Sequence, residues 1–157
     1  MEGNELINLF RKDLINLNNK ATSQEEFFDS AYSELYKKEY VKDNFKESII
    51  QREKKYPTGL LLENVSIAIP HTDSEHIKEA FVYINKLEHE INFYQMGNEE
   101  EVVTVKDVWM LGIKDPAKQV NLLAFIMELF NNPEFIQKYK EVSESEDLLE
   151  LIKESIK

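Results

Sequence analysis

Three histidines are the candidates for nucleophilic or acid–base chemistry near neutral pH, because the chain contains no cysteine. His71 follows the apolar segment 67–70, after which the chain turns polar. A strand that ends at Pro70 would deliver this histidine to the edge of a cleft, where α/β folds commonly carry out chemistry. The alternative interpretation is an ordinary loop histidine.

A metal site is the second possibility, since Asp73 and Glu75 lie between His71 and His76. Helical residues five positions apart point about 140° from each other at about 3.6 residues per turn, whereas the familiar metal-binding pair is spaced by four. No third ligand is evident, so we expect neither a metal nor a cofactor. His89 lies in a polar segment and is expected to be solvated in a turn.

Arg52 is one of only two arginines in the chain, the other being Arg11. It is expected at the end of a helix that Pro57 stops, because proline cannot continue the hydrogen-bond ladder. Its planar guanidinium could bind an oxyanion there. The alternative is a surface ion pair with Glu53 or with another of the many acids.

A helix start at Asp115 and Pro116 offers free backbone N–H groups and the positive end of the helix dipole, which together favour an anion. Lys118 lies near that end, against the preference of the dipole, and a bound anion would offset this. The alternative is an exposed lysine without a role.

The elements that must position these residues follow from the apolar periodicity and from helix-start signals. The helices are expected over 23–38 and about 43–53, with three more starts at 115–116, 132–133 and 143–146. The strands are expected at 14–17, 60–62, 65–69, 80–84, 91–94 and 105–113, with a solvated acidic turn over 94–101 and Trp109 in the core. This order predicts an α/β fold in one domain, a mixed β-sheet sandwiched between helices.

Composition excludes several classes of function. The 19 basic and 30 acidic residues give a net charge of −11, which argues against nucleic acid or anionic lipid as a partner. The longest apolar run, 122–127, is too short for a membrane span, and no secretory signal is evident, so a cytoplasmic protein without membrane insertion is expected. No Walker loop or GxGxxG motif appears, so direct use of ATP is not expected.

The pair 52–53 (RE), then 56–59 (YPTG), then 67–71 (IAIPH), in this order and spacing, resembles the signature of fructose/mannitol-type enzyme IIA domains. These domains belong to the bacterial phosphoenolpyruvate-dependent sugar phosphotransferase system (PTS). The likeness covers nearly the whole chain and implies a single PTS EIIA type-2 domain over 1–157 with the mannitol/fructose-type IIA fold. The REx3PTG spacing and a second histidine five residues after the first, His76, are similar to the galactitol-specific branch.

The resemblance implies a phosphotransferase component, a histidine phosphocarrier. His71 would accept a phosphoryl group from phospho-HPr and pass it to a cysteine of a cognate IIB protein, which acts with a membrane IIC. Arg52 would stabilise the phosphoryl group. Mannitol-type members carry a second histidine at the start of a later helix, where this chain, like galactitol-type proteins, has Gln119; its amide could hydrogen-bond the phosphoryl group but could not relay a proton.

Two other functions stay open. A regulatory IIA-like protein would use the same site and signal through partners that read its phosphorylation state. An unrelated small binding or metal module would lack phosphate acceptance altogether. The absence of cysteine excludes the IIB partner itself.

Overall fold

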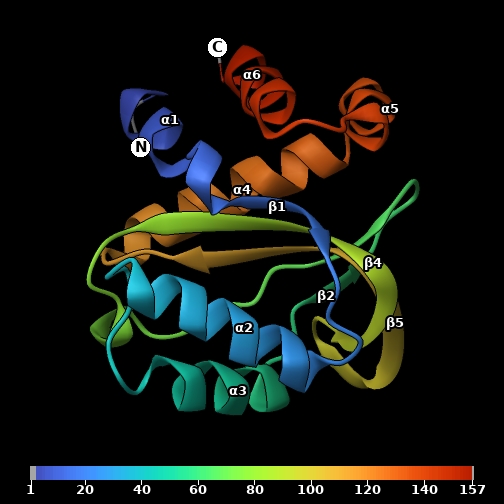
Figure 1. Ribbon diagram of the computed structural model, residues 1–157. Coiled ribbons are helices and arrows are strands. Elements are labelled where there is room, and N and C mark those ends of the chain that lie inside the picture. Colours follow the sequence, from blue (N-terminus) through green and yellow to red (C-terminus); the bar gives the residue numbers. More distant parts are fainter. Residues whose placement is uncertain (1–2, 157) are drawn as a thin grey trace.

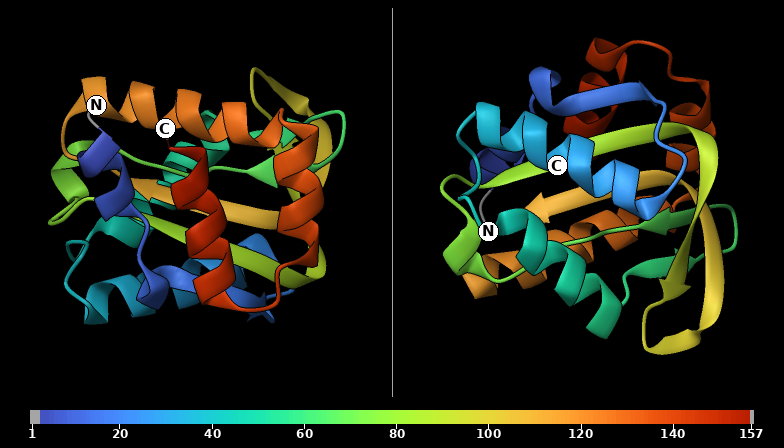
Figure 2. Two further views of the ribbon diagram at one scale, coloured as in Figure 1. Left: turned by 90° about the horizontal axis from the view of Figure 1, so that it is seen from above. Right: turned by 60° about the horizontal axis from the view of Figure 1, so that its bottom comes forward.

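The computed structural model describes residues 3–156, in which a five-stranded mixed sheet lies between two layers of helices (Figure 1). Two helices cover one face of the sheet, and the other helices cover the opposite face (Figure 2). The predicted sandwich is therefore confirmed. The first pair is α2 (Gln24–Lys37) and α3 (Phe45–Lys55); the opposite layer holds α1 (Gly3–Leu9), α4 (Pro116–Phe130), α5 (Pro133–Glu141) and α6 (Ser145–Ser155).

A long antiparallel hairpin, β4 (Phe81–Gln95) with β5 (Asn98–Gly112), forms the centre of the sheet. β1 (Ile15–Asn19) runs parallel to β4, and β3 (Ser66–Ala68) runs parallel to β5. The short β2 (Gly59–Leu61) pairs antiparallel with β3 and also meets the far end of β4. This topology delivers the chain from β3 directly to His71.

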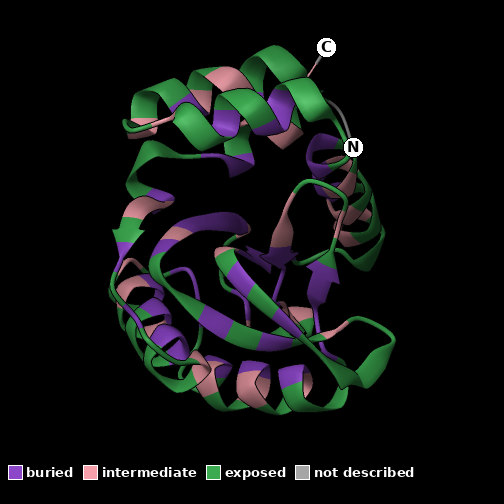
Figure 3. Ribbon diagram, turned by 90° about the vertical axis from the view of Figure 1, so that its right-hand side faces the viewer, coloured by how far each residue is buried: buried purple, intermediate pink, exposed green. Residues whose placement is uncertain are grey.

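Both faces of the sheet are buried because successive strand residues point to opposite sides. Phe81 and Tyr83 pack with the cluster that includes α2 and α3, whereas Val82 and Ile84 pack with the α4–α6 layer. Trp109 is fully buried in the second cluster, as predicted. Figure 3 shows the same division, with buried segments on the helix sides that face the sheet and exposed segments outside.

Two predictions about the sheet were wrong. The expected polar turn around His89 is part of β4, which continues through 88–90 as exposed strand residues, with an irregular register between Lys86 and Ile91. The acidic run 99–101 likewise belongs to β5 and is exposed. The turn is confined to Met96 and Gly97, where Gly97 has φ 81°, a conformation that glycine adopts without strain.

The helix starts follow the predicted caps in most cases. The side chains of Ser23, Asp115 and Asn132 accept hydrogen bonds from the first turns of α2, α4 and α5. The predicted cap at Ser143 was wrong, because α6 begins after Glu144 without a side-chain cap. Within the described residues, no helix is both long and apolar enough to cross a membrane.

Candidate functional site

The segment that carries His71 is anchored on both sides within the sheet. The Ile69 N–H donates to the Thr58 carbonyl at 3.2 Å, which extends the pairing of β3 with β2. The Leu111 N–H donates to the Pro70 carbonyl at 2.9 Å, which extends the pairing with β5. These two hydrogen bonds therefore hold the backbone of Ile69 and Pro70, directly before His71, at the end of the sheet.

Two side-chain contacts hold the histidine itself and the residue that follows it. The hydroxyl oxygens of Thr72 and Ser48 lie 2.6 Å apart and join this segment to α3. His71 Nδ1 lies 2.8 Å from the Ile69 carbonyl oxygen. A carbonyl oxygen can only accept, so Nδ1 carries the proton and, in the neutral ring, Nε2 carries the free lone pair.

The charge state of His71 follows from its surroundings. Burial lowers the pKa of its imidazole, and the guanidinium of Arg52 lowers it further, while the hydrogen bond to Ile69 opposes these effects. Because the ordinary pKa of histidine is about 6.5, a lowered value keeps the ring neutral at pH 7. A neutral imidazole with one nitrogen held and the other free is a competent nucleophile.

Arg52, in the last turn of α3, presents its guanidinium to this region. Nη1 donates to Asp73 Oδ1 at 3.1 Å, and the guanidinium carbon lies 4.8 Å from the centre of the Tyr56 ring. Arg52 Nε is buried without a hydrogen-bond partner in the part of the chain that the structure describes. A buried donor of this kind gains free energy when it meets an acceptor, about 1–3 kcal/mol.

An open cleft of about 420 Å³ brings the predicted residues of two distant segments together. Arg52 and Thr72 line it together with Pro116 and Gln119 of α4, whereas His71, which directly precedes Thr72 in the chain, is not among its lining residues. The first turn of α4 thus faces the same space as the guanidinium. Lys118 does not take part, because its ammonium pairs with Glu5 of α1 at 2.7 Å.

His76 is separate from His71. Its Nδ1 lies 2.9 Å from the amide oxygen of Asn44, and its Nε2 lies 3.5 Å from a carboxylate oxygen of Glu75. Ligand atoms of Asp73, Glu75 and His76 lie within 4.8 Å of one another, whereas His71 is outside this group. The two carboxylates are exposed, and Asp73 is already paired with Arg52.

The sequence did not reveal the partners of Glu53. The ion pair considered for Arg52, with Glu53 or with another acid, is found in its second form: Arg52 pairs with Asp73, whereas Glu53 is buried against Thr58. A signal was present in the sequence, because Glu53 follows Phe45 and Ile49 at intervals of four on the inward face of α3.

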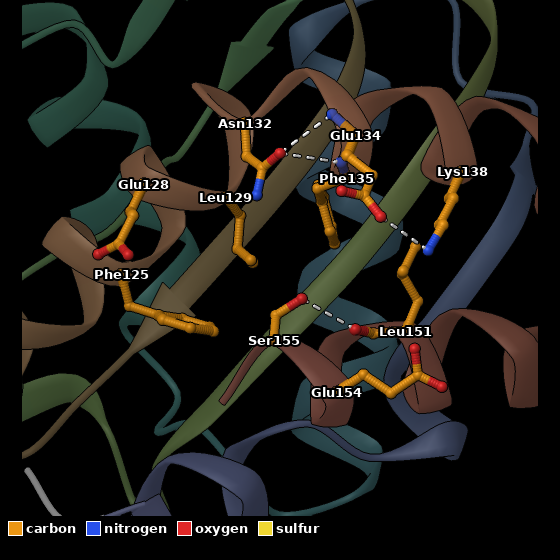
Figure 4. Close-up of a pocket in the computed structure, with 10 residues that line it drawn as sticks. All are labelled: Phe125, Glu128, Leu129, Asn132, Glu134, Phe135, Lys138, Leu151, Glu154 and Ser155. Carbon is orange, nitrogen blue, oxygen red and sulfur yellow. Dashed lines mark hydrogen bonds and ion pairs between the residues drawn. The ribbon is translucent and has the colours of Figure 1, made fainter. Parts of the chain in front are cut away.

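A second hollow, of about 300 Å³, lies between α4, α5 and α6 (Figure 4). Apolar side chains such as Phe125 and Leu151 line it together with polar and charged ones, among which Glu134 accepts from Lys138 at 3.3 Å. None of its ten lining residues is a histidine or an arginine. Its side chains therefore lack the groups for the chemistry expected of this chain.

The chain matches the family model described as "Phosphoenolpyruvate-dependent sugar phosphotransferase system, EIIA 2" over residues 8–155. Galactitol-specific EIIA components of Escherichia coli are 30% identical over 105 residues, which are 67% of this chain and 69% of theirs.

Two solved structures share the fold at low sequence identity. The structure of the complex of IIA-mannitol with phosphorylated IIB-mannitol from Escherichia coli matches with a TM-score of 0.69 and 20% identity, over 89% of this chain and 94% of that chain. The nitrogen regulatory protein IIA-Ntr from Neisseria meningitidis matches with a TM-score of 0.73 and 17% identity, over 94% and 99%. Since the family model covers most of the chain, this protein belongs to the EIIA 2 family of the sugar phosphotransferase system, whose members are phosphotransferase components that carry a phosphoryl group on histidine.

Proposed function

We propose that this chain is a phosphocarrier that takes a phosphoryl group from phospho-HPr onto Nε2 of His71 and passes it to a cysteine of a cognate IIB protein. The IIB protein would act with a membrane IIC. The observation that supports this most directly is the contact of Nδ1 with the Ile69 carbonyl, which leaves Nε2 as the nucleophilic atom. The galactitol-specific relatives favour uptake of a sugar or polyol, with galactitol as the first candidate.

In the first step, a bond forms between His71 Nε2 and phosphorus while the phosphorus–nitrogen bond of phospho-HPr breaks. In the second step, the cysteine thiolate of IIB attacks phosphorus, and His71 leaves as the neutral imidazole. Phosphoryl transfer depends mainly on positioning and on neutralising the oxygens. Nδ1 keeps its proton and its contact with Ile69 in both steps.

Arg52 neutralises phosphoryl oxygens in this proposal, and Gln119, which lines the same cleft, donates an amide N–H. The buried Nε of Arg52 would gain an acceptor. The phosphoryl group competes with the exposed carboxylate of Asp73 for the guanidinium, so phosphorylation is expected to release Asp73. The first turn of α4 adds backbone N–H groups to the same space.

The proposal treats residues 1–157 as a single EIIA domain that works in the cytoplasm, which the family match over 8–155 supports. No metal takes part in either step, and no nucleic acid partner is expected from a chain of net charge −11.

The test is incubation with purified phospho-HPr in the presence of a chelator, followed by intact-mass analysis. The wild-type chain should gain one phosphoryl group that is lost in acid and survives in base, as expected for a phosphoramidate. His71→Ala should fold and gain none, whereas His76→Ala and His89→Ala should gain one. Labelling of folded His71→Ala at the wild-type rate would refute the proposal, and transfer that vanishes in chelator and returns with zinc would refute its metal-free mechanism.

A regulatory role is the second candidate, because the nitrogen regulatory protein IIA-Ntr shares this fold. The phosphorylated site would be the same in both cases. Capture of partners by the phosphorylated and unphosphorylated chain separates the two functions. Recovery of a IIB protein favours transport, whereas recovery of a sensor or regulator without a IIB protein favours regulation.

A further inference from the structure

Glu53 is a buried carboxylate in the last turn of α3, with only 5% of its surface exposed. It occupies the inward face of the helix, where Phe45 and Ile49 precede it at intervals of four. An ionisable side chain is rarely buried without a specific partner, because desolvation of the charge is costly. Neither step of the proposed phosphoryl transfer uses this group directly.

The partners of Glu53 all belong to one residue. The Thr58 N–H donates to Oε2 and the Thr58 hydroxyl donates to Oε1, both at 2.8 Å. The next residue is fixed as well, since a Cβ on Gly59 would lie 2.6 Å from the carbonyl oxygen of Tyr94. The two hydrogen bonds of the carboxylate thus fix the position of Thr58 in the connection between α3 and β2.

Thr58 is connected to His71 by two further hydrogen bonds. The Thr58 carbonyl accepts from the Ile69 N–H at 3.2 Å, and the Ile69 carbonyl accepts from His71 Nδ1 at 2.8 Å. We propose that Glu53 is a positioning residue for phosphoryl transfer: through Thr58 and Ile69 it fixes the tautomer and orientation of the His71 ring. This inference rests on the proposed function of His71.

The geometry assigns this role to the acceptor oxygens of Glu53 rather than to its charge. A glutamine could replace it, because its amide oxygen can accept from the Thr58 N–H while its amide N–H donates to the Thr58 hydroxyl oxygen. An alanine leaves both Thr58 groups without partners and frees the segment that carries Ile69. A displacement of about 1 Å in such a support can slow a reaction by about a hundredfold.

The experiment combines two measurements on wild type, Glu53→Ala, Glu53→Gln and the control Glu47→Ala. Glu47 lies on the same helix and is exposed. The first measurement is the 15N NMR signal of the His71 ring in the unphosphorylated chain, which reports the tautomer. The second is the rate of labelling by phospho-HPr.

We expect Glu53→Ala to populate the second tautomer of His71 and to slow labelling about 10- to 100-fold. Glu53→Gln should recover both properties, and Glu47→Ala should resemble wild type. If Glu53→Ala does not fold, Thr58→Val is the test variant, because it removes only the hydroxyl of Thr58. It should change the tautomer population of His71 and the labelling rate in the same direction as Glu53→Ala, but to a smaller extent.

A folded Glu53→Ala, or Thr58→Val in its place, with the wild-type tautomer and the wild-type labelling rate would overturn the inference. A wild-type chain that takes no phosphoryl group at all would instead refute the proposed function. The NMR measurement does not require phosphorylation, so the two failures are distinguishable.

Discussion

Two acidic side chains, the buried Glu53 and the partly buried Asp107, lie on opposite sides of the sheet, and their partners differ. Among the described residues, the Glu53 carboxylate accepts hydrogen bonds from Thr58 alone, and burial raises the pKa of its carboxyl to about 7. Asp107 of β5 accepts from the hydroxyl of Tyr139 in α5 at 2.7 Å. Burial raises the pKa of Asp107 as well, but the Tyr139 hydroxyl and the ammonium of Lys86 oppose that rise.

The side chains around Asp107 tie helix α5 to the sheet, and in the described part of the chain none of their hydrogen bonds is made with His71 or Ile69. Trp109 Nε1 donates to the Tyr139 hydroxyl at 3.2 Å, and Lys86 Nζ donates to the Tyr139 carbonyl. The hydrogen bonds of Glu53, in contrast, lead to the histidine through Ile69. We therefore expect one carboxylate to support phosphoryl transfer and the other to support packing, so that changes on the two sides have separable effects.

The largest effect is expected on the side of the site, at Arg52. Loss of a preorganised charged donor typically slows a reaction by about 10²–10³-fold. We expect Arg52→Ala to slow labelling by phospho-HPr by that factor without changing the melting temperature. Arg52→Lys should recover only part of the rate, because the planar fork is lost. Arg11→Ala is the matched control, since Arg11 pairs with Asp13 and is exposed. A wild-type labelling rate in Arg52→Ala would show that Arg52 has no part in the transfer.

The pKa of Glu53 predicts a pH dependence of stability. It is raised from 4.5 to about 7 in the folded chain, so between these values only the folded state holds the proton. The free energy of unfolding therefore falls as pH rises through this interval, by up to about 3 kcal/mol. Urea unfolding at pH 5 and pH 7.5 should show this loss in wild type and Glu47→Gln but not in Glu53→Gln. Equal slopes in all three proteins would contradict the raised pKa.

A loss of stability without loss of transfer is expected at Tyr139. Tyr139→Phe removes the hydroxyl and leaves the buried groups of Asp107 and Trp109 without this partner. The free energy of unfolding should fall by about 1–3 kcal/mol, measured by urea denaturation. The labelling rate at 25 °C should not change, and the control Tyr94→Phe, at an exposed position, should alter neither property. A slower labelling rate in folded Tyr139→Phe would contradict the expectation that this side of the sheet affects stability but not phosphoryl transfer.

Local signals in the sequence predicted most of the fold. Proline after Asp115 and Asn132 gave two helix starts, and alternating apolar residues gave the buried part of the hairpin. The prediction failed over 88–90 because the pairing of β4 with β5 resumes at Ile91 after an irregular register, so long-range pairing on both sides keeps this polar, exposed stretch within the strand. Polarity alone could not identify that segment as strand.

For the site, spacing and resemblance identified Arg52, His71 and Gln119 as the residues of interest. The sequence could not single out Asp73 as the partner of Arg52 or Thr58 as the partner of Glu53, because both contacts depend on how α3 packs against the segments that follow it. Long-range contacts of this kind leave no periodic trace in one sequence. The buried glutamate at the helical interval of four was the one available sign.

The smallest effect is expected at Gln119, which lines the same cleft as Arg52. Gln119→Ala should slow labelling only a few-fold, because the backbone N–H groups of the first turn of α4 can still neutralise an oxygen. The amide has no titrating proton, so the rate should rise with pH through a single ionisation, that of His71, and level off at neutral pH since the pKa of that imidazole lies below its usual value. Gln119→His should keep activity and add a second ionisation to the pH profile. Two coupled ionisations in the pH profile of the wild-type chain would contradict this prediction, because they would mean that a titrating group other than Gln119 acts beside His71.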